Sequence, residues 1–107
     1  MIKVEQPGAG DETRAFEPQL AQDSAYYFAC NRSKASITVN LRSPEGQTIV
    51  RELAQKVDVL VENFSPGAIA RIGLGWNVVR EINPRLIMCS ISAFGQQGAL
   101  AQLKGFD

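Results

Sequence analysis

The chain has 107 residues, with 11 Lys or Arg against 11 Asp or Glu, and it contains no histidine. This length predicts a single domain over residues 1–107, and the balanced charge argues against a protein that binds nucleic acid or an anionic membrane. The absence of histidine excludes His-dependent catalytic triads and most zinc sites from this chain, so we predict no metal site.

Two cysteines, Cys30 and Cys89, stand among apolar or small residues in distant parts of the sequence. We expect two free, buried thiols in a reduced cytoplasm, and the alternative is a disulfide or a catalytic thiol. No apolar run approaches the roughly 20 residues of a membrane-spanning helix, and residues 1–5 lack the charged-then-apolar order of a signal peptide. We therefore predict a cytoplasmic protein without membrane contact.

Residues 1–5 have the pattern of the end of a strand that runs directly into a loop rich in Gly and Pro. Since nothing precedes this strand, we expect an upstream element to be missing. Residues 6–23 are mostly polar and have no usable period, which predicts a long loop with Phe16 as its large apolar anchor. Residues 24–31 mix aromatic and small side chains and fit either a short helix or a short strand.

The pattern is clearer from residue 36 onward. Residues 36–41 alternate apolar and polar side chains, which predicts a half-buried strand. Ser43 and Pro44 form a start signal for a helix, and apolar residues at three- and four-residue spacing extend that helix over residues 44–57. Residues 57–61 form a short, mainly apolar run rich in β-branched valine, as in a strand that is buried on both faces. Together these segments predict a βαβ unit with a right-handed crossover.

A second helix is predicted to begin at Pro66, because Ser65 and Pro66 repeat the serine-proline start signal. Ile69 and Ile72 are expected to face inward from this helix. Glycine at position 73 is expected to end it, since glycine readily adopts the left-handed conformation that follows many helices.

Residues 76–82 are predicted to form a short helix that ends at Asn83, and residues 86–91 to form a third buried strand. Trp76 and Phe94 are expected in the core rather than at a ligand. The alternation of strands and helices predicts an α/β fold: an open, mostly parallel sheet with flanking helices, of the Rossmann-like kind.

Ligands of such sheets bind beyond the carboxyl ends of the strands, where backbone N–H groups converge on anions. Residues 62–67 have this position together with suitable side chains, because Gly67 permits close approach of the backbone and Asn63 and Ser65 are short and polar. Arg71 follows a little over one helical turn later, where a guanidinium reaches a phosphate. The alternative is a plain helix cap followed by a solvated arginine, since no Walker-type or GxGxxG spacing is present.

Several blocks of the sequence occur in the order known from one enzyme family. They are IKVE at 2–5, GDETR at 10–14, NRSKASIT at 31–38, SPEG at 43–46, DVLVENFSPG at 58–67, NPRLI at 83–87 and SISAFG at 90–95. These blocks resemble the N-terminal region of class III CoA-transferases, a family that includes formyl-CoA and carnitine CoA-transferases and alpha-methylacyl-CoA racemase. The resemblance covers essentially the whole chain.

The resemblance implies a partial α/β domain, because members of the family are several hundred residues long and form interlocked homodimers. It implies CoA or acyl-CoA as a substrate, with no covalently bound cofactor, and a carboxylic acid as the second substrate. In the family's transferases CoA moves between carboxylic acids through an active-site aspartate, which becomes an acyl anhydride and then a CoA thioester.

The resemblance also implies a set of CoA contacts. The family's Asn-Phe-x-Pro-Gly loop falls on Asn63, Phe64 and Gly67, and the arginine in the helix behind that loop falls on Arg71. A lysine shortly after the Ser-x-x-x-Phe-Gly strand end falls on Lys104. We expect these residues to hold the phosphoadenosine end of CoA.

Three positions match the family less well. Gln6 stands where members contact the nucleotide end of CoA, often with a basic residue. The family's nucleophilic aspartate lies beyond residue 107, so no catalytic residue is predicted, and Asp107 is kept only as a candidate for an acidic group that supports the site. Racemases have a histidine where this chain has Phe106, and a phenyl ring cannot move a proton, so racemase chemistry is disfavoured.

The sequence therefore predicts a piece of a CoA-transferase that retains part of the CoA site and is inactive alone. Two alternatives remain open. One is a non-catalytic module that associates with itself through uncovered sheet edges, and the other is one half of a split enzyme.

Overall fold

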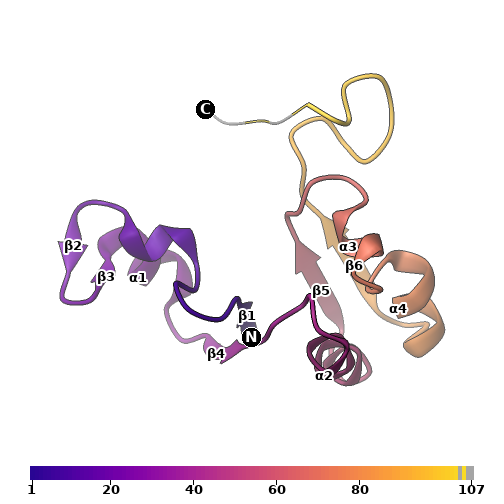
Figure 1. Ribbon diagram of the computed structural model, residues 1–107, viewed down its shortest axis with the longest axis horizontal. Helices are drawn as coiled ribbons and strands as arrows, with labels where there is room; N and C mark the ends of the chain where they lie inside the picture. The colour runs from indigo at the N-terminus through magenta and orange to yellow at the C-terminus, as the bar shows by residue number, and fades with distance from the viewer. Residues whose placement is uncertain (104, 106–107) are drawn as a thin grey trace. The chain divides into compact units, whose positions relative to one another are not determined.

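The structure is a computed structural model that describes residues 1–103 and 105. Contacts group the chain into two compact units, Met1–Leu41 and Arg42–Asp107, and each is described by itself (Figure 1). The elements in chain order are β1 (Ile2–Glu5), η1 (Glu12–Ala15), β2 (Gln19–Leu20), β3 (Asp23–Ser24), α1 (Ala25–Asn31), β4 (Ala35–Thr38), α2 (Pro44–Ala54), β5 (Val59–Glu62), α3 (Ala68–Arg71), α4 (Trp76–Ile82) and β6 (Ile87–Ser90). The single domain predicted over residues 1–107 stays a prediction.

The first unit is built on the parallel pair of β1 and β4, in which Ile2 pairs with Ala35. Between these strands the chain forms the 3₁₀ helix η1, the short antiparallel strands β2 and β3, and helix α1. Helix α1 begins where the Ser24 hydroxyl oxygen accepts a hydrogen bond from the Tyr27 N–H at 2.8 Å. The segment that fitted either a helix or a strand is thus a helix, and the predicted loop over residues 6–23 contains short ordered elements.

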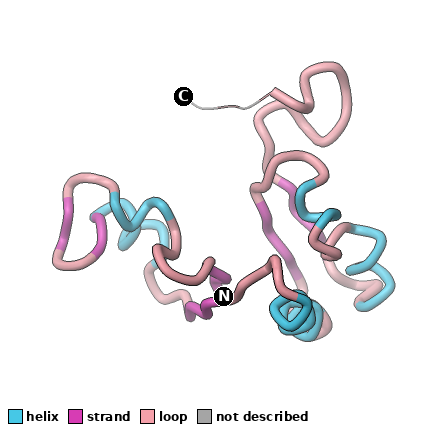
Figure 2. The backbone as a smooth tube through the Cα atoms, in the orientation of Figure 1, coloured by secondary structure: helices cyan, strands magenta, loops and turns pink. Residues whose placement is uncertain are grey.

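The second unit is built on the parallel pair of β5 and β6, in which Val59 pairs with Ile87 and Glu62 with Ser90. Helices α3 and α4 connect the two strands, and α2 precedes β5 (Figure 2). The core lies where α2 and α4 meet one face of this pair. Its buried residues are Ala54, Val79 and Leu86, with Val57, Leu60 and Met88 packed against them.

Helix α2 begins as the sequence predicts, because the Ser43 hydroxyl oxygen accepts a hydrogen bond from the Gly46 N–H at 3.1 Å and Pro44 occupies the first turn. It ends at Ala54, earlier than the predicted residue 57. The side-chain amide of Asn83 donates hydrogen bonds to the carbonyls of Ala54 and Val57, at 3.0 and 3.1 Å. The bond to Ala54 satisfies a carbonyl that the end of α2 leaves without a helical partner, and the bond to Val57 holds the connection that leads into β5.

The predicted α/β class, with parallel strands and flanking helices, is confirmed. The strand pairing differs from the βαβ unit expected over residues 36–61, because β4 and β5 belong to different two-stranded sheets. The parallel pair with a purely helical connection is β5 and β6 instead. Periodicity reveals that a segment is a strand, but the choice of a neighbour depends on tertiary packing.

Some predictions about burial are wrong. Trp76 and Phe94, expected in the core, are 44% and 47% exposed. Cys30 and Cys89 are free, as expected, but both are exposed rather than buried. Successive side chains of a strand point to opposite faces, so Cys89 faces away from the side on which its neighbour Met88 packs. In the described residues, no helix is long and apolar enough to cross a membrane.

Candidate functional site

The loop after β5 contains a tight turn over residues 65–68. The Ser65 carbonyl accepts a hydrogen bond from the Ala68 N–H at 2.9 Å, and Gly67 has φ 79° and ψ −9°. These angles are those of the third residue of a type II turn, a position that favours glycine, and Pro66 occupies the second position, where proline is common. The Ser-Pro-Gly sequence therefore forms a turn, and the predicted serine-capped helix starting at Pro66 is wrong, since α3 begins at Ala68.

The turn brings Gly67 and Arg71 together. The Arg71 N–H donates a hydrogen bond to the Gly67 carbonyl at 3.1 Å, and a Cβ added to Gly67 would lie 3.4 Å from Nη1 of Arg71. The exposed guanidinium thus folds back beside the turn instead of extending away from it. Asn63 and Phe64 precede the turn and are also exposed, so the four loop residues predicted from the sequence lie on one short stretch of surface.

Glu62, the last residue of β5, binds the backbone at the start of this loop. Its side chain is buried, with the residue only 7% exposed, and Oε2 accepts a hydrogen bond from the Phe64 N–H at 2.8 Å. Its carbonyl accepts a hydrogen bond from the Ile91 N–H at 2.8 Å. Glu62 was not among the residues predicted to form the site, although a carboxylate at the end of an apolar strand is a signal that the sequence contains.

The remaining predicted residues lie elsewhere in the chain. Gln6 belongs to the first unit, where its exposed side chain donates a hydrogen bond from Nε2 to the Gly10 carbonyl at 3.1 Å. Lys104 and Asp107 lie outside the described residues, as does Phe106.

A buried carboxylate network organises the loop around Gln6. Glu5 ends β1, is 6% exposed, and is bound by Arg14 through two parallel hydrogen bonds of 2.9 Å, from Nε to Oε2 and from Nη2 to Oε1. Arg14 also donates from Nη1 to Asp23 at 2.7 Å. The Arg14 hydrogen bonds hold the pKa of the Glu5 carboxyl well below its ordinary value, against the opposing effect of burial. Hydrogen bonds from the Ser36 and Tyr27 side chains lower it further.

Tyr27 completes this network. Its hydroxyl donates to Oε1 of Glu5 at 2.8 Å and accepts from Nη2 of Arg14 at 2.6 Å, and the Arg14 guanidinium carbon lies 3.9 Å from its ring centroid. Burial raises the pKa of the Tyr27 hydroxyl, and the hydrogen bond to Glu5 adds to this shift. Beside it, Lys3 forms an ion pair with Asp11. Residues of blocks 2–5 and 10–14 therefore bind one another in a structural network, which hydrophobic periodicity does not reveal.

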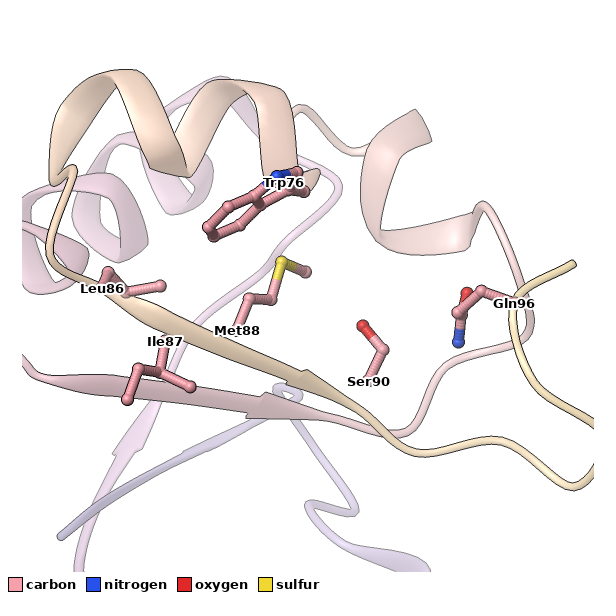
Figure 3. Close-up of a pocket in the computed structure, with 6 residues that line it drawn as sticks. All are labelled: Trp76, Leu86, Ile87, Met88, Ser90 and Gln96. Atoms are coloured by element: carbon pink, nitrogen blue, oxygen red, sulfur yellow. The ribbon is translucent and has the colours of Figure 1, made fainter.

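Two hollows lie in the second unit. The larger, of about 510 Å³, is mainly apolar and lies between α4 and β6 (Figure 3). It is lined by Trp76, Leu86, Ile87, Met88, Ser90 and Gln96. The smaller, of about 190 Å³, lies beside the connection between α2 and β5. Neither of these two hollows is lined by the loop residues predicted to bind CoA, and the binding role of those exposed residues stays a prediction. Among residues 1–103 and 105, no group of three His, Cys, Asp or Glu side chains is placed to hold a metal ion.

Comparison with known proteins decides the family. The model of CoA-transferase family III matches residues 1–107. The chain belongs to this family. It is 47% identical over 108 aligned residues to succinyl-CoA:glutarate CoA-transferase of Homo sapiens, covering 100% of this chain and 25% of that protein. It is 44% identical over 106 residues to acetyl-CoA:oxalate CoA-transferase of Acetobacter aceti, covering 99% of this chain and 27% of that protein.

The solved structure of a CaiB/BaiF family protein from Brucella suis aligns with a TM-score of 0.91 at 43% identity, over 99% of this chain and 29% of that chain. The resemblance found in the sequence is thereby confirmed for the whole chain. The chain spans about a quarter of the length of the curated relatives it matches.

Proposed function

We propose that this chain contributes coenzyme A-binding residues to an enzyme that transfers CoA between carboxylic acids. The observation that carries the proposal is the Arg71 guanidinium beside the Gly67 turn at the carboxyl end of β5. Membership of the family supports it, because the relatives named above are CoA-transferases that act on CoA thioesters and carboxylic acids. No catalytic residue is proposed within this chain.

The chemistry of the loop suits a phosphorylated nucleotide. A guanidinium offers several N–H donors in one plane and binds phosphate oxygens through two of them at once. Glycine at the turn leaves room for a phosphate to approach the backbone. Phe64, at 41% exposure, offers an aromatic surface to the purine of the same ligand. Gln6 and Lys104 are proposed as further contacts to CoA, by family position alone.

Calorimetric titration with CoA tests this proposal. Arg71→Ala removes the only guanidinium proposed to touch phosphate, and a charge-assisted hydrogen bond of this kind contributes about 1.5–3 kcal/mol, so we expect binding to weaken about 10-fold or more. Arg80→Ala is the matched control, because Arg80 is an exposed arginine on α4 in the same unit. Binding that is absent in the unaltered chain, or equally strong in both variants, would remove the proposal.

A second candidate is an assembly module, as a self-associating piece or as one part of a split enzyme. The observation that favours it is the outward face of β5 and β6, where Val61 and Ile87 are 60% and 63% exposed. Parallel sheets are normally covered on both faces, so this apolar surface favours association. A homodimer and a cytoplasmic location belong to this part of the proposal, and two free cysteines fit a reducing compartment.

Sedimentation over a range of concentrations tests association, and the two cysteines add a local readout. Cys89 lies on β6 and alternates to the outward face with Ile87, whereas Cys30 lies on α1 in the other unit. Association through the β5–β6 face predicts that Cys89 becomes protected from a thiol reagent as concentration rises while Cys30 continues to react. A monomer at every concentration, with both thiols equally reactive, contradicts this candidate.

A further inference from the structure

We propose that the buried carboxylate of Glu62 is a positioning residue for the CoA-binding loop, setting the direction of the chain over residues 63–67. The inference rests on the proposed function, since it concerns the same loop. Glu62 itself is not proposed to touch the ligand.

The contacts of Glu62 place it where it controls the loop. Glu62 lies on the inward face of β5, because its neighbours in alternation, Val59 and Val61, are exposed. The hydrogen bond of 2.8 Å from the Phe64 N–H to Oε2 closes a short ring around Asn63. Asn63, within this ring, is exposed, and the loop continues into the Gly67 turn.

A second strand of the protein shows the same arrangement. Glu5 is the last residue of β1, is buried, and accepts a hydrogen bond at Oε2 from the backbone N–H of Asp11 at 3.0 Å. Gln6, the other proposed CoA contact described by the structure, follows it directly. Each of these strands therefore ends in a buried glutamate that binds the backbone of the next loop, and each loop carries a proposed contact. Because Glu5 also holds Arg14, its replacement would disturb the whole first unit, and Glu62 is the better residue to test.

The direction in which CoA affinity changes distinguishes a positioning role of Glu62 from a simple effect of its negative charge. A carboxylate close to a phosphate-binding loop repels the ligand, so removal of the Glu62 charge alone would strengthen CoA binding. Loss of the hydrogen bond to Phe64 would instead free the loop and weaken binding, because the ordering of the loop would then oppose association. The two effects change affinity in opposite directions.

The experiment compares Glu62→Ala with Glu62→Gln, using Glu81→Ala as the charge-matched control on the exposed side of α4. CoA affinity is measured by calorimetry, folding by thermal unfolding, and the hydrogen bond by the amide proton shift of Phe64 in NMR spectra. We expect Glu62→Ala to bind CoA about tenfold more weakly, with an upfield shift of the Phe64 amide proton. Glu62→Gln keeps an acceptor oxygen, so we expect it to restore binding to at least the level of the unaltered chain. Glu81→Ala is expected to bind as the unaltered chain does.

The outcomes separate this inference from the proposed function. If the unaltered chain binds CoA but Glu62→Ala binds equally well or more tightly, the positioning role is wrong and the CoA site stands. If Glu62→Gln is as weak as Glu62→Ala although both fold, the hydrogen bond to Phe64 is not the cause and the inference fails. If the unaltered chain does not bind CoA, the proposed function fails and this inference fails with it.

Discussion

Replacement of Arg14 by alanine should destabilise the first unit strongly. The substitution removes both charged donors to Glu5, whose side chain is only 4% exposed. Removing one partner of a buried ion pair costs about 3–5 kcal/mol, because it leaves a buried charge without compensation. The Arg14 side chain is 31% exposed, and Glu5 keeps donors from Ser36, Tyr27 and the Asp11 backbone. Water and these donors offset part of the loss, so we expect a cost of about 3 kcal/mol.

Urea unfolding of Arg14→Ala, Arg14→Lys and Arg32→Ala measures this cost. Arg32 follows α1 in the same unit and is exposed, so its replacement should change the unfolding free energy by no more than about 0.5 kcal/mol. Lysine keeps the charge of Arg14 but cannot form two parallel hydrogen bonds, which predicts an intermediate stability. Equal unfolding midpoints for the Arg14 and Arg32 variants would refute the conclusion that this network stabilises the unit.

Two further predictions concern stability. The folded-state pKa of Glu5 lies well below its ordinary value of 4.5, so the stability from this carboxylate is present above pH 4.5 and is lost as the pH falls toward the folded-state value. Below pH 4.5, the urea midpoint should therefore decrease more steeply with falling pH in the unaltered chain than in Glu5→Gln. Parallel curves of midpoint against pH would contradict this. Asn83→Ala leaves the carbonyls of Ala54 and Val57 without this donor and should cost about 1–2 kcal/mol. It should lower the melting temperature more than Asn77→Ala, an equivalent change at an exposed position of α4. Equal melting temperatures would count against this role of Asn83.

Local signals in the sequence were sufficient where the structure depends on neighbouring residues. Helix α4 has the bounds Trp76–Ile82, as predicted, and Ser43 caps α2 as its position before Pro44 indicates. The four-residue spacing from Gly67 to Arg71 was enough to bring the two together, because it equals about one helical turn.

The same kind of signal failed at Ser65-Pro66-Gly67. Serine followed by proline starts helix α2 at Pro44, with Ser43 as its cap. At residues 65–67, glycine in the third place allows the positive φ of a type II turn, and the turn forms instead. The preference of glycine for this conformation outweighed the preference of serine for a helix cap. Pro-Gly was thus the more informative pair of residues.

Contacts between distant residues could not be predicted from periodicity. The network around Glu5 joins residues that are 6 to 31 positions apart in sequence, and nothing in the polar segment 6–23 indicates which acid meets which base. Burial of Trp76 and Cys89 likewise depends on what packs against them, which their own residue type does not determine. Strand pairing also depends on tertiary packing. Glu62 was missed because its hydrogen bond to Phe64 depends on the path of the loop backbone.

The proposed surface site for the phosphorylated end of CoA, beside the Gly67 turn, can be tested by titrating the unaltered chain with CoA and with pantetheine in parallel. Pantetheine has the thiol arm of CoA but lacks its phosphates and its adenosine. We expect measurable binding of CoA and little or no binding of pantetheine. Equal affinity for the two ligands, or no binding of either, would contradict it.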